Sequence, residues 1–214
     1  MGDLLLLRHG ETAWTLSRQH TSHTDLPLTA HGEEEATRIA PLLAAHDIGL
    51  VLTSPLRRAV RTAELAGAAG AEVEQALREW DYGGYEGVTT AEIHRNRPTW
   101  NLWSDGVAPG PAGHPGESPR DVGRRADRVL ARIEPMLRDP AAGDVLLVAH
   151  GHILRVLTAR RLGLPPSAGA LFALDTGTVS RLGVEHGRPV VKAWNMTGST
   201  ATGARAAGPG AAAA

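Results

Sequence analysis

The 214-residue sequence contains no cysteine. This absence excludes disulfides, thiolate nucleophiles and cysteine-ligated metal centres. No apolar run reaches the length of a membrane span, and the opening leucines are too few for the apolar region of a signal peptide. A net charge of −1 provides no overall basic field for nucleic acid or acidic membranes. We therefore expect a cytoplasmic monomer or homodimer with neither a nucleic-acid nor a membrane partner.

Two nucleotide-binding signatures are also missing, the Gly-x-x-x-x-Gly-Lys loop and the Gly-x-Gly-x-x-Gly fingerprint. The ten histidines include two closely spaced pairs, His150 with His152 and His20 with His23. A metal site made from either pair needs further ligands, and no carboxylate cluster accompanies them along the chain. We therefore expect no metal and no cofactor.

Two apolar runs each end in a histidine followed by a glycine. Residues 4–7 are all leucine and lead into Arg8-His9-Gly10, and residues 145–149 lead into His150-Gly151. Runs of this kind are typical of strands buried on both faces of a parallel sheet. Open α/β sheets bind ligands at the carboxyl ends of their strands. If the two strands are neighbours, His9 and His150 meet at such an edge.

Short apolar runs alternate with segments of helical periodicity, which predicts a three-layer α/β/α sandwich with a mostly parallel central sheet. Further strands are expected at 48–53, 71–75, 170–174, 179–185 and 189–194. Helices are expected to begin at Thr29, Ser54-Pro55, Thr89, Ser118-Pro119 and Ile153. We interpret 10–28 and 105–119 as loops, and the Ala/Gly-rich residues 198–214 as a disordered tail.

Arginines follow the strand expected at 48–53. Arg57 and Arg58 lie at a helix start, where free backbone N–H groups favour an anion. Together with two imidazoles they would suit a dianionic tetrahedral group, because guanidinium forks match phosphate oxygens. Each residue also has an ordinary interpretation: a hydrogen-bonded structural histidine, or a solvated arginine, which is our interpretation of Arg57.

Four motifs in order resemble the histidine phosphatase superfamily, the phosphoglycerate mutase-like enzymes. They are Leu7-Arg8-His9-Gly10-Glu11-Thr12-Ala13-Trp14, Ser54-Pro55-Leu56-Arg57-Arg58, Leu77-Arg78-Glu79 through Tyr85-Glu86-Gly87, and Val148-Ala149-His150-Gly151. The resemblance implies a phosphoglycerate mutase-like fold and one catalytic domain over residues 1–197.

The resemblance also implies roles. His9 would attack phosphorus and form a phosphohistidine, while Arg8, Arg58 and His150 would hold the phosphoryl oxygens. Glu79 would protonate the leaving oxygen and then activate water. Asp81 and Glu86 are rival carboxylates, but the family spacing selects Glu79, and we interpret Glu86 as a residue that structures its loop.

Substrate contacts follow less directly from the motifs. Many family members carry Asn after the Trp of the first motif, whereas this chain has Thr15, whose hydroxyl is also a donor. Thr21, Ser22 and His152 are further expected contacts. Trp100 and Trp103 either close the pocket or pack in the core.

The stretch from Trp100 to Ser118 is short and has one histidine and no arginine. Mutases of the family carry a longer basic insertion here, so a phosphatase is favoured. Among phosphatases, the motifs of this chain resemble two neighbouring branches of the family: the actinobacterial broad-specificity acid phosphatases, and sugar bisphosphatases such as sedoheptulose-1,7-bisphosphatase. They imply a metal-independent phosphomonoesterase whose partner is a small phosphorylated metabolite, a sugar phosphate or bisphosphate. The alternatives are a cofactor-dependent phosphoglycerate mutase and an inactive relative that binds phosphorylated ligands.

Overall fold

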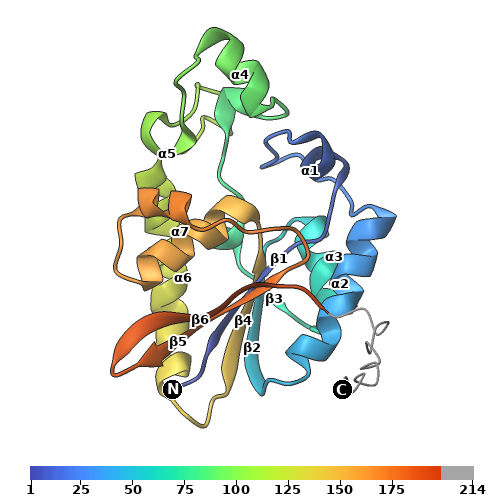
Figure 1. Ribbon diagram of the computed structural model, residues 1–214, viewed down its shortest axis with the longest axis vertical. Helices are drawn as coiled ribbons and strands as arrows, with labels where there is room; N and C mark the ends of the chain where they lie inside the picture. Colours follow the sequence, from blue (N-terminus) through green and yellow to red (C-terminus); the bar gives the residue numbers. More distant parts are fainter. Residues whose placement is uncertain (199–214) are drawn as a thin grey trace, which may run out of the picture.

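The computed structural model describes residues 1–198, which form a six-stranded sheet flanked by helices (Figure 1). The strand order is β3-β2-β4-β1-β5-β6. The strands are β1 (Leu4–Arg8), β2 (Ile48–Thr53), β3 (Glu72–Val73), β4 (Asp144–Ala149), β5 (Val179–Glu185) and β6 (Arg188–Met196). The pairs β1–β4, β2–β4 and β2–β3 are parallel, whereas β5 is antiparallel to β1 and β6. The expected mostly parallel sheet is confirmed.

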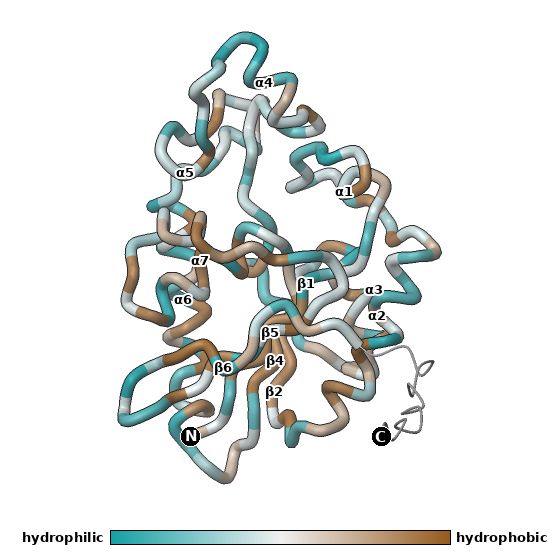
Figure 2. The backbone as a smooth tube through the Cα atoms, viewed as in Figure 1, coloured by the Kyte–Doolittle hydropathy of each residue, from teal (hydrophilic) through white to brown (hydrophobic). Residues whose placement is uncertain are grey.

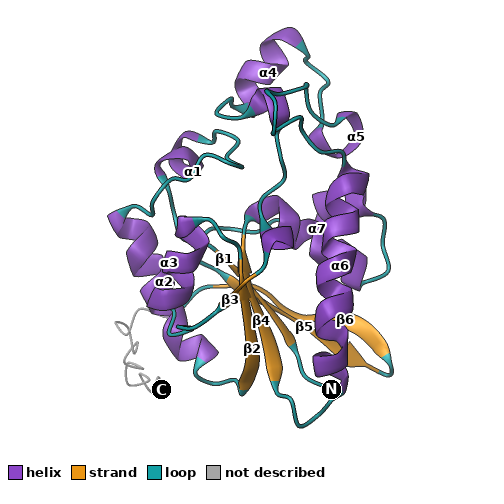
Figure 3. Cartoon of the chain, turned by 180° about the vertical axis from the view of Figure 1, so that it is seen from behind, coloured by secondary structure: helices purple, strands orange, loops and turns teal. Residues whose placement is uncertain are grey.

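Side chains of β1 alternate between two cores, as the pleat of a strand requires. Leu4 and Leu6 pack with α6 (Pro119–Arg138) and α7 (Gly151–Arg161), while Leu5 and Leu7 pack with α2 (Ala30–Leu43) and α3 (Arg57–Leu65). The hydrophobic residues accordingly concentrate along the central strands in Figure 2. Helices on both faces make the three expected layers, seen from behind in Figure 3.

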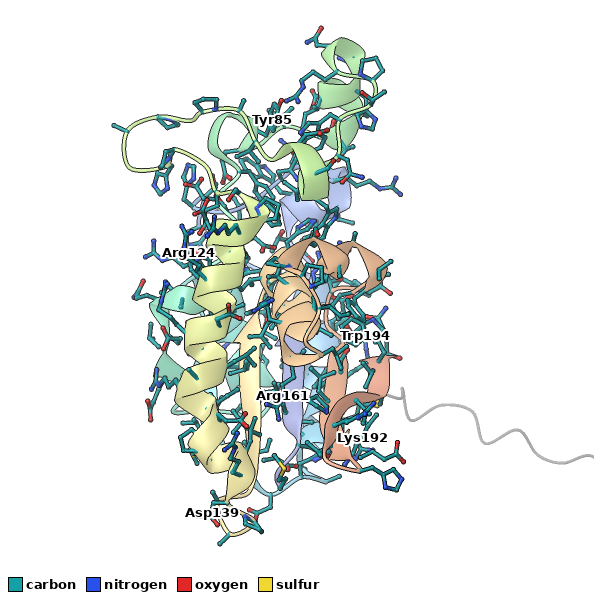
Figure 4. The ribbon with its side chains drawn as sticks, turned by 90° about the vertical axis from the view of Figure 1, so that its left-hand side faces the viewer. Tyr85, Arg124, Asp139, Arg161, Lys192 and Trp194 are labelled. Carbon is teal, nitrogen blue, oxygen red and sulfur yellow. The ribbon has the colours of Figure 1, made fainter. Side chains whose placement is uncertain are left out.

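A cap of short elements lies beyond the carboxyl ends of the parallel strands (Figure 1). It contains α1 (Ala13–Ser17), α4 (Thr90–Asn96), α5 (Leu102–Asp105) and the 3₁₀ turn η2 (Gly83–Tyr85). In the side view of Figure 4, Tyr85 lies in this cap and Asp139 at the opposite end of the molecule. Two further 3₁₀ turns are η1 (Gln75–Leu77) and η3 (Pro166–Leu171). No helix among residues 1–198 has the length and apolar character needed to cross a bilayer.

Three helix starts agree with the sequence. Thr29, Thr89 and Ser118 are N-caps of α2, α4 and α6, and the last two form capping boxes. Each hydroxyl accepts a hydrogen bond from a backbone N–H that has no partner within its own helix. Pro41 lies inside α2 without ending it. The expected tail lies, from residue 199 on, outside the described residues.

The expected helix start at Ser54-Pro55 is wrong. Leu56 is the N-cap of α3, and it makes no side-chain capping bond. The Ser54 N–H donates to the Val148 carbonyl and extends the pairing of β2 with β4. The N–H of Arg57 donates to the Asp25 carboxylate, 2.9 Å away, so a side chain of this chain already occupies part of the helix start.

Two other expectations are also corrected. Residues 170–174 form no strand, because the 3₁₀ turn η3 extends to Leu171 and the Arg155 side chain donates to the carbonyls of Gly169 and Ala170. The segment 10–28 is not entirely loop, since α1 forms within it. Thr12 and Thr15 make a reciprocal capping box that is sufficient to start this one short helix.

Gly10 and Gly32 allow the chain after β1 to cross the start of α2 in close contact. A Cβ added at Gly10 would lie 2.2 Å from the Gly32 carbonyl oxygen, and one added at Gly32 would lie 2.2 Å from the Glu11 carbonyl oxygen. Both neighbours are backbone atoms, which cannot move aside as the end of a side chain can. This crossing positions the residue that follows β1, His9.

We expect Gly32→Ala to lower the free energy of unfolding by about 1–3 kcal/mol, the usual range for an overpacked site. The loss should appear although alanine is better than glycine in a helix by about 1 kcal/mol. Gly151→Ala is the matched control, since its added Cβ would meet only ordinary contacts at 3.4 Å. Urea unfolding of the three proteins measures the difference, and equal stability of the two variants would contradict the close crossing.

Candidate active site

Parallel pairing of β1 with β4 brings the two strand-end histidines together. The register aligns Arg8 with Ala149, so His9 and His150 follow at the same edge of the sheet. Their ring centroids are 5.0 Å apart and their planes cross at 64°. Both side chains are buried, with 4% and 0% of their surface exposed.

The hydrogen bond of His9 determines which ring nitrogen can react. Its Nδ1 lies 2.8 Å from the Gly10 carbonyl oxygen. A carbonyl only accepts hydrogen bonds, so Nδ1 carries the proton of the neutral ring and Nε2 keeps its lone pair. Burial lowers the pKa of His9 well below its usual value, and the charges of Arg58 and Arg8 lower it further. The ring is therefore neutral, with the lone pair of Nε2 unprotonated.

His150 is fixed in the opposite tautomer. The Nε of Arg58 donates to its Nδ1 at 3.1 Å, and its Nε2 lies 2.7 Å from the Ser54 hydroxyl. Because Nδ1 accepts, Nε2 carries the proton of the neutral ring. Burial and then the charge of Arg58 lower the pKa of His150 well below its usual value. Ser54, which the sequence marked as a helix cap, is a partner of this histidine instead.

Arg58 is 1% exposed and connects His150 to the loop after α1. Its terminal nitrogens donate to the carbonyls of Thr24 at 3.0 Å, Ser22 at 3.1 Å and Thr21 at 3.4 Å. Burial lowers its pKa, which Glu79 and other carboxylates partly oppose. A guanidinium has five N–H donors. The three contacts with carbonyls and the bond to His150 use four of them. At least one donor is left for a ligand.

Arg8 has a buried Nε with no hydrogen-bond partner among the described residues. One terminal nitrogen donates to the Leu174 carbonyl. The guanidinium passes beside Gly151, where an added Cβ would lie 3.4 Å from it. Burial lowers the pKa of Arg8, while the carboxylate of Glu79 opposes the shift. A buried unpaired donor is costly, so this Nε is a candidate contact for an anionic ligand.

Glu79 is held at the start of α7 by three backbone N–H groups. Its Oε1 accepts from Trp80 and Ile153, both at 2.9 Å, and its Oε2 accepts from His152 at 3.0 Å. A carboxylate at a helix N-terminus is also favoured by the helix dipole. The side chain is 8% exposed, and it lines the same cavity as Arg8 and His9.

This cavity has a volume of about 250 Å³. Arg8, His9 and Glu79 contribute to its wall together with side chains of the loop after β1 and of α7, whereas Arg58 and His150 are not among its lining residues. It is lined by Arg8, His9, Trp14, Thr15, Arg18, Gln19, His20, Thr21, Glu79, Tyr82, Gly151, His152, Arg155 and Leu174. The Tyr82 hydroxyl lies 2.6 Å from Nδ1 of His152. Burial lowers the pKa of His152 and raises that of Tyr82, so both groups stay neutral.

Thr15, Thr21 and Ser22 were expected to contact the substrate through their hydroxyls, but only the first two line the cavity. Thr15 and Thr21 line the cavity, but their hydroxyls donate to the carbonyls of Thr12 and Gln19. Ser22 is 4% exposed, and its hydroxyl donates to Glu86. These protons are already used within the protein, which weakens the case for all three as donors to a substrate. His152 remains a wall residue.

Glu86 is a loop-structuring residue, as expected, and the loop it holds is the one after α1: its carboxylate accepts from the backbone N–H groups of Ser22 and Thr24. Trp100 is 5% exposed and packs in the core. The sequence showed no carboxylate cluster beside the histidine pairs, whereas the structure places Asp81 and His114 next to His23.

Several cavity residues were not identified from the sequence, including Arg18, Tyr82 and Arg155. Arg155 lies 4.7 Å above the Trp103 ring, in a cation–π contact. The sequence did contain a signal for Arg155. It follows His152 by three residues, and residues three apart on a helix lie on the same face. Arg18 and Tyr82 had no such signal, since they come from irregular segments.

The family model of the histidine phosphatase superfamily (branch 1) matches residues 4–197. An acid phosphatase of Mycobacterium tuberculosis is 41% identical, over 91% of this chain and 93% of its own length. A sedoheptulose 1,7-bisphosphatase of Saccharomyces cerevisiae is 35% identical, over 75% and 67% respectively. A probable phosphoglycerate mutase of Yersinia enterocolitica is 34% identical, over 91% and 90%.

Solved structures agree with these relatives. The product of a Mycobacterium tuberculosis open reading frame superposes with a TM-score of 0.83 at 40% identity, covering 92% of this chain and 99% of that one. A mycobacterial glucosyl-3-phosphoglycerate phosphatase, solved with VO3, has a TM-score of 0.77 at 29% identity, covering 91% and 99%. The expected fold family is confirmed.

Burial, opposed by Glu86, lowers the pKa of His20 to about 4, below the unfolded value near 6.5. The unfolded chain therefore takes up the proton first, and stability present above pH 6.5 is lost as the pH falls toward 4. We expect His20→Asn to reduce the loss of unfolding free energy between pH 7 and pH 5 by about 1–2 kcal/mol. Urea unfolding at both pH values tests this, and parallel losses in variant and wild type would contradict it.

Proposed function

Because the chain belongs to the histidine phosphatase superfamily and is a phosphatase, we propose that it hydrolyses phosphomonoesters of small metabolites through a phosphohistidine at His9. One juxtaposition carries the proposal. The reactive Nε2 of a neutral, buried His9 shares a cavity with the unpaired Nε of Arg8 and the carboxylate of Glu79. A nucleophile, an anion-binding donor and an acid–base group are the parts that such a reaction requires.

In the first step, Nε2 of His9 attacks phosphorus and the bond from phosphorus to the leaving oxygen breaks. Glu79, in its protonated form, donates a proton to that oxygen. Arg8 and Arg58 bind the phosphoryl oxygens and stabilise their charge in the transition state. In the second step, water attacks phosphorus, Glu79 accepts its proton, and the bond from phosphorus to nitrogen breaks. Inorganic phosphate is released, and neutral His9 and protonated Glu79 are restored for the next cycle.

His150 has a specific part in this proposal. Its Nε2–H is directed at the Ser54 hydroxyl, 2.7 Å away. When a phosphoryl group enters, this donor passes from the serine to a phosphoryl oxygen, while the bond from Arg58 to Nδ1 keeps the tautomer unchanged. Ser54 is then a positioning residue, because its hydrogen bond with Nε2 fixes the orientation of the His150 ring without touching the reacting atoms.

The substrate class follows from the size and charge of the cavity. A volume of about 250 Å³ suits a small metabolite. Arg18 and Arg155 add positive charge to the wall, apart from the arginines assigned to the transferred phosphoryl group. A second anionic group on the substrate would complement them, so sugar phosphates and bisphosphates are the proposed substrates. The yeast relative, named a sedoheptulose 1,7-bisphosphatase, is consistent with that choice.

The phosphoglycerate mutase alternative is supported by the Yersinia relative, which is named a probable phosphoglycerate mutase. Against it, residues 100–118 bring no arginine to the cap. A screen of sugar monophosphates, sugar bisphosphates and phosphoglycerates separates the two reactions. Release of inorganic phosphate supports hydrolysis, whereas transfer to an isomer of the substrate supports the mutase. An inactive relative that only binds phosphorylated ligands would release no phosphate from any of them.

His9→Asn should lower phosphate release from an aryl phosphate by several orders of magnitude, since it removes the covalent nucleophile. The matched control is His31→Asn, an exposed histidine of α2 outside the cavity, which should keep wild-type turnover. Rapid quenching should trap an acid-labile phosphoenzyme in wild type and in the control. Full hydrolysis by His9→Asn would refute the proposed mechanism.

Glu79→Gln should slow release of a sugar alcohol far more than release of a nitrophenolate, because a good leaving group needs no proton. We expect on the order of 10²-fold or more for the sugar phosphate, the usual contribution of general acid–base catalysis. Asp81→Asn is the neighbouring control, which should not discriminate between the leaving groups. Steady-state kinetics on both substrates measures the ratio, and an equal slowing of both by Glu79→Gln would remove its acid role.

A further inference from the structure

Three potential metal ligands meet beside the active site, outside the cavity lining. Ligand atoms of His23, Asp81 and His114 all lie within 4.8 Å of one another, and all three residues are half-buried. This is the only such group of three in the part of the chain that the structure describes. The residues come from three separate segments: the loop after α1, the loop that carries Glu79, and the Gly/Pro-rich loop 105–119.

Asp81 is oriented before any ligand binds. Its Oδ1 accepts from the N–H of Gly83 at 3.0 Å, and its Oδ2 accepts from the N–H of Gly116 at 3.1 Å. Each carboxylate oxygen keeps a further lone pair for a cation. The contact with Gly116 also joins this carboxylate to the loop that carries His114, so two of the ligands are placed by one short piece of backbone.

His23 is oriented by a polar neighbour as well. Its Nδ1 lies 3.3 Å from the Ser22 hydroxyl, whose proton goes to the Glu86 carboxylate. Nε2 is then the nitrogen left to bind a metal. Metal-binding histidines commonly have an outer partner of this kind on the second ring nitrogen. The ring of His114 stacks on that of His23, with centroids 3.8 Å apart and planes inclined by 16°.

We propose that His23, Asp81 and His114 bind a divalent transition metal of the Zn²⁺ class, which fastens loop 105–119 to the wall of the active site. Two imidazoles and one carboxylate form a donor set that zinc accepts, with water in the fourth position. Rotation of the two stacked side chains would direct one ring nitrogen of each toward a shared ion. The metal has a structural role, because none of its three ligands lines the cavity that contains His9.

The test is a Zn²⁺ titration of the full chain in phosphate-free buffer, in competition with a chromophoric zinc chelator. Wild type should bind one ion per chain, and Zn²⁺ should raise its Tm. His114→Phe keeps an aromatic ring against His23 but removes the ligand atom, and Asp81→Asn keeps the shape of the side chain but removes its charge. Each should weaken binding by more than the 10- to 100-fold typical for loss of an outer-shell partner, and should abolish the rise in Tm.

Two controls separate this site from other histidines. His31→Phe removes an exposed histidine of α2, and His9→Asn removes the candidate nucleophile. Both should bind Zn²⁺ like wild type. The proposal is overturned if no ion binds stoichiometrically, if His114→Phe and Asp81→Asn bind as tightly as wild type, or if either control loses the ion. Circular dichroism of each variant checks that it folds.

Discussion

The parallel pairing of β1 with β4 is the constraint on which the active site depends. The two strands run side by side in register, so the residues that follow them, His9 and His150, leave the sheet at one edge. Antiparallel pairing would have placed these histidines at opposite ends of the sheet. The pairing is stabilised by leucines and valines that are buried on both faces, beneath α2 and α3 on one side and α6 and α7 on the other.

A single buried guanidinium extends this arrangement beyond the sheet. Arg58 donates to a ring nitrogen of His150 and to the carbonyls of Thr21, Ser22 and Thr24. Burying an arginine is costly unless its donors are paired, and these partners supply that pairing. The same charge helps to keep both histidines neutral, which is the state that the proposed nucleophile His9 requires. Arg58 therefore has two effects: it holds the loop after α1 in place, and it helps to keep His9 and His150 neutral.

Much of the fold followed from local signals. Unbroken apolar runs marked β1 and β4, and capping residues marked α2, α4 and α6, because burial and N-terminal hydrogen bonds act over a few residues. Local signals failed where a distant group competed. Ser54 has the residue type of a cap, but the extended pairing of β2 and the ring of His150 take its backbone and side chain. Residues 170–174 have the composition of a strand, but Arg155 takes two carbonyls in this region.

By itself the sequence determined the layered α/β architecture, the family, and the five side chains expected to carry the chemistry, through four motifs in a fixed order. Only the tertiary structure decided what each polar group does. It directed the hydroxyls of Thr15, Thr21 and Ser22 into the protein, brought Arg155 into the cavity, and placed Asp81 beside the stacked pair His23 and His114. The reason is physical: residue type sets which bonds a group can make, but its partners come from segments far away in the chain.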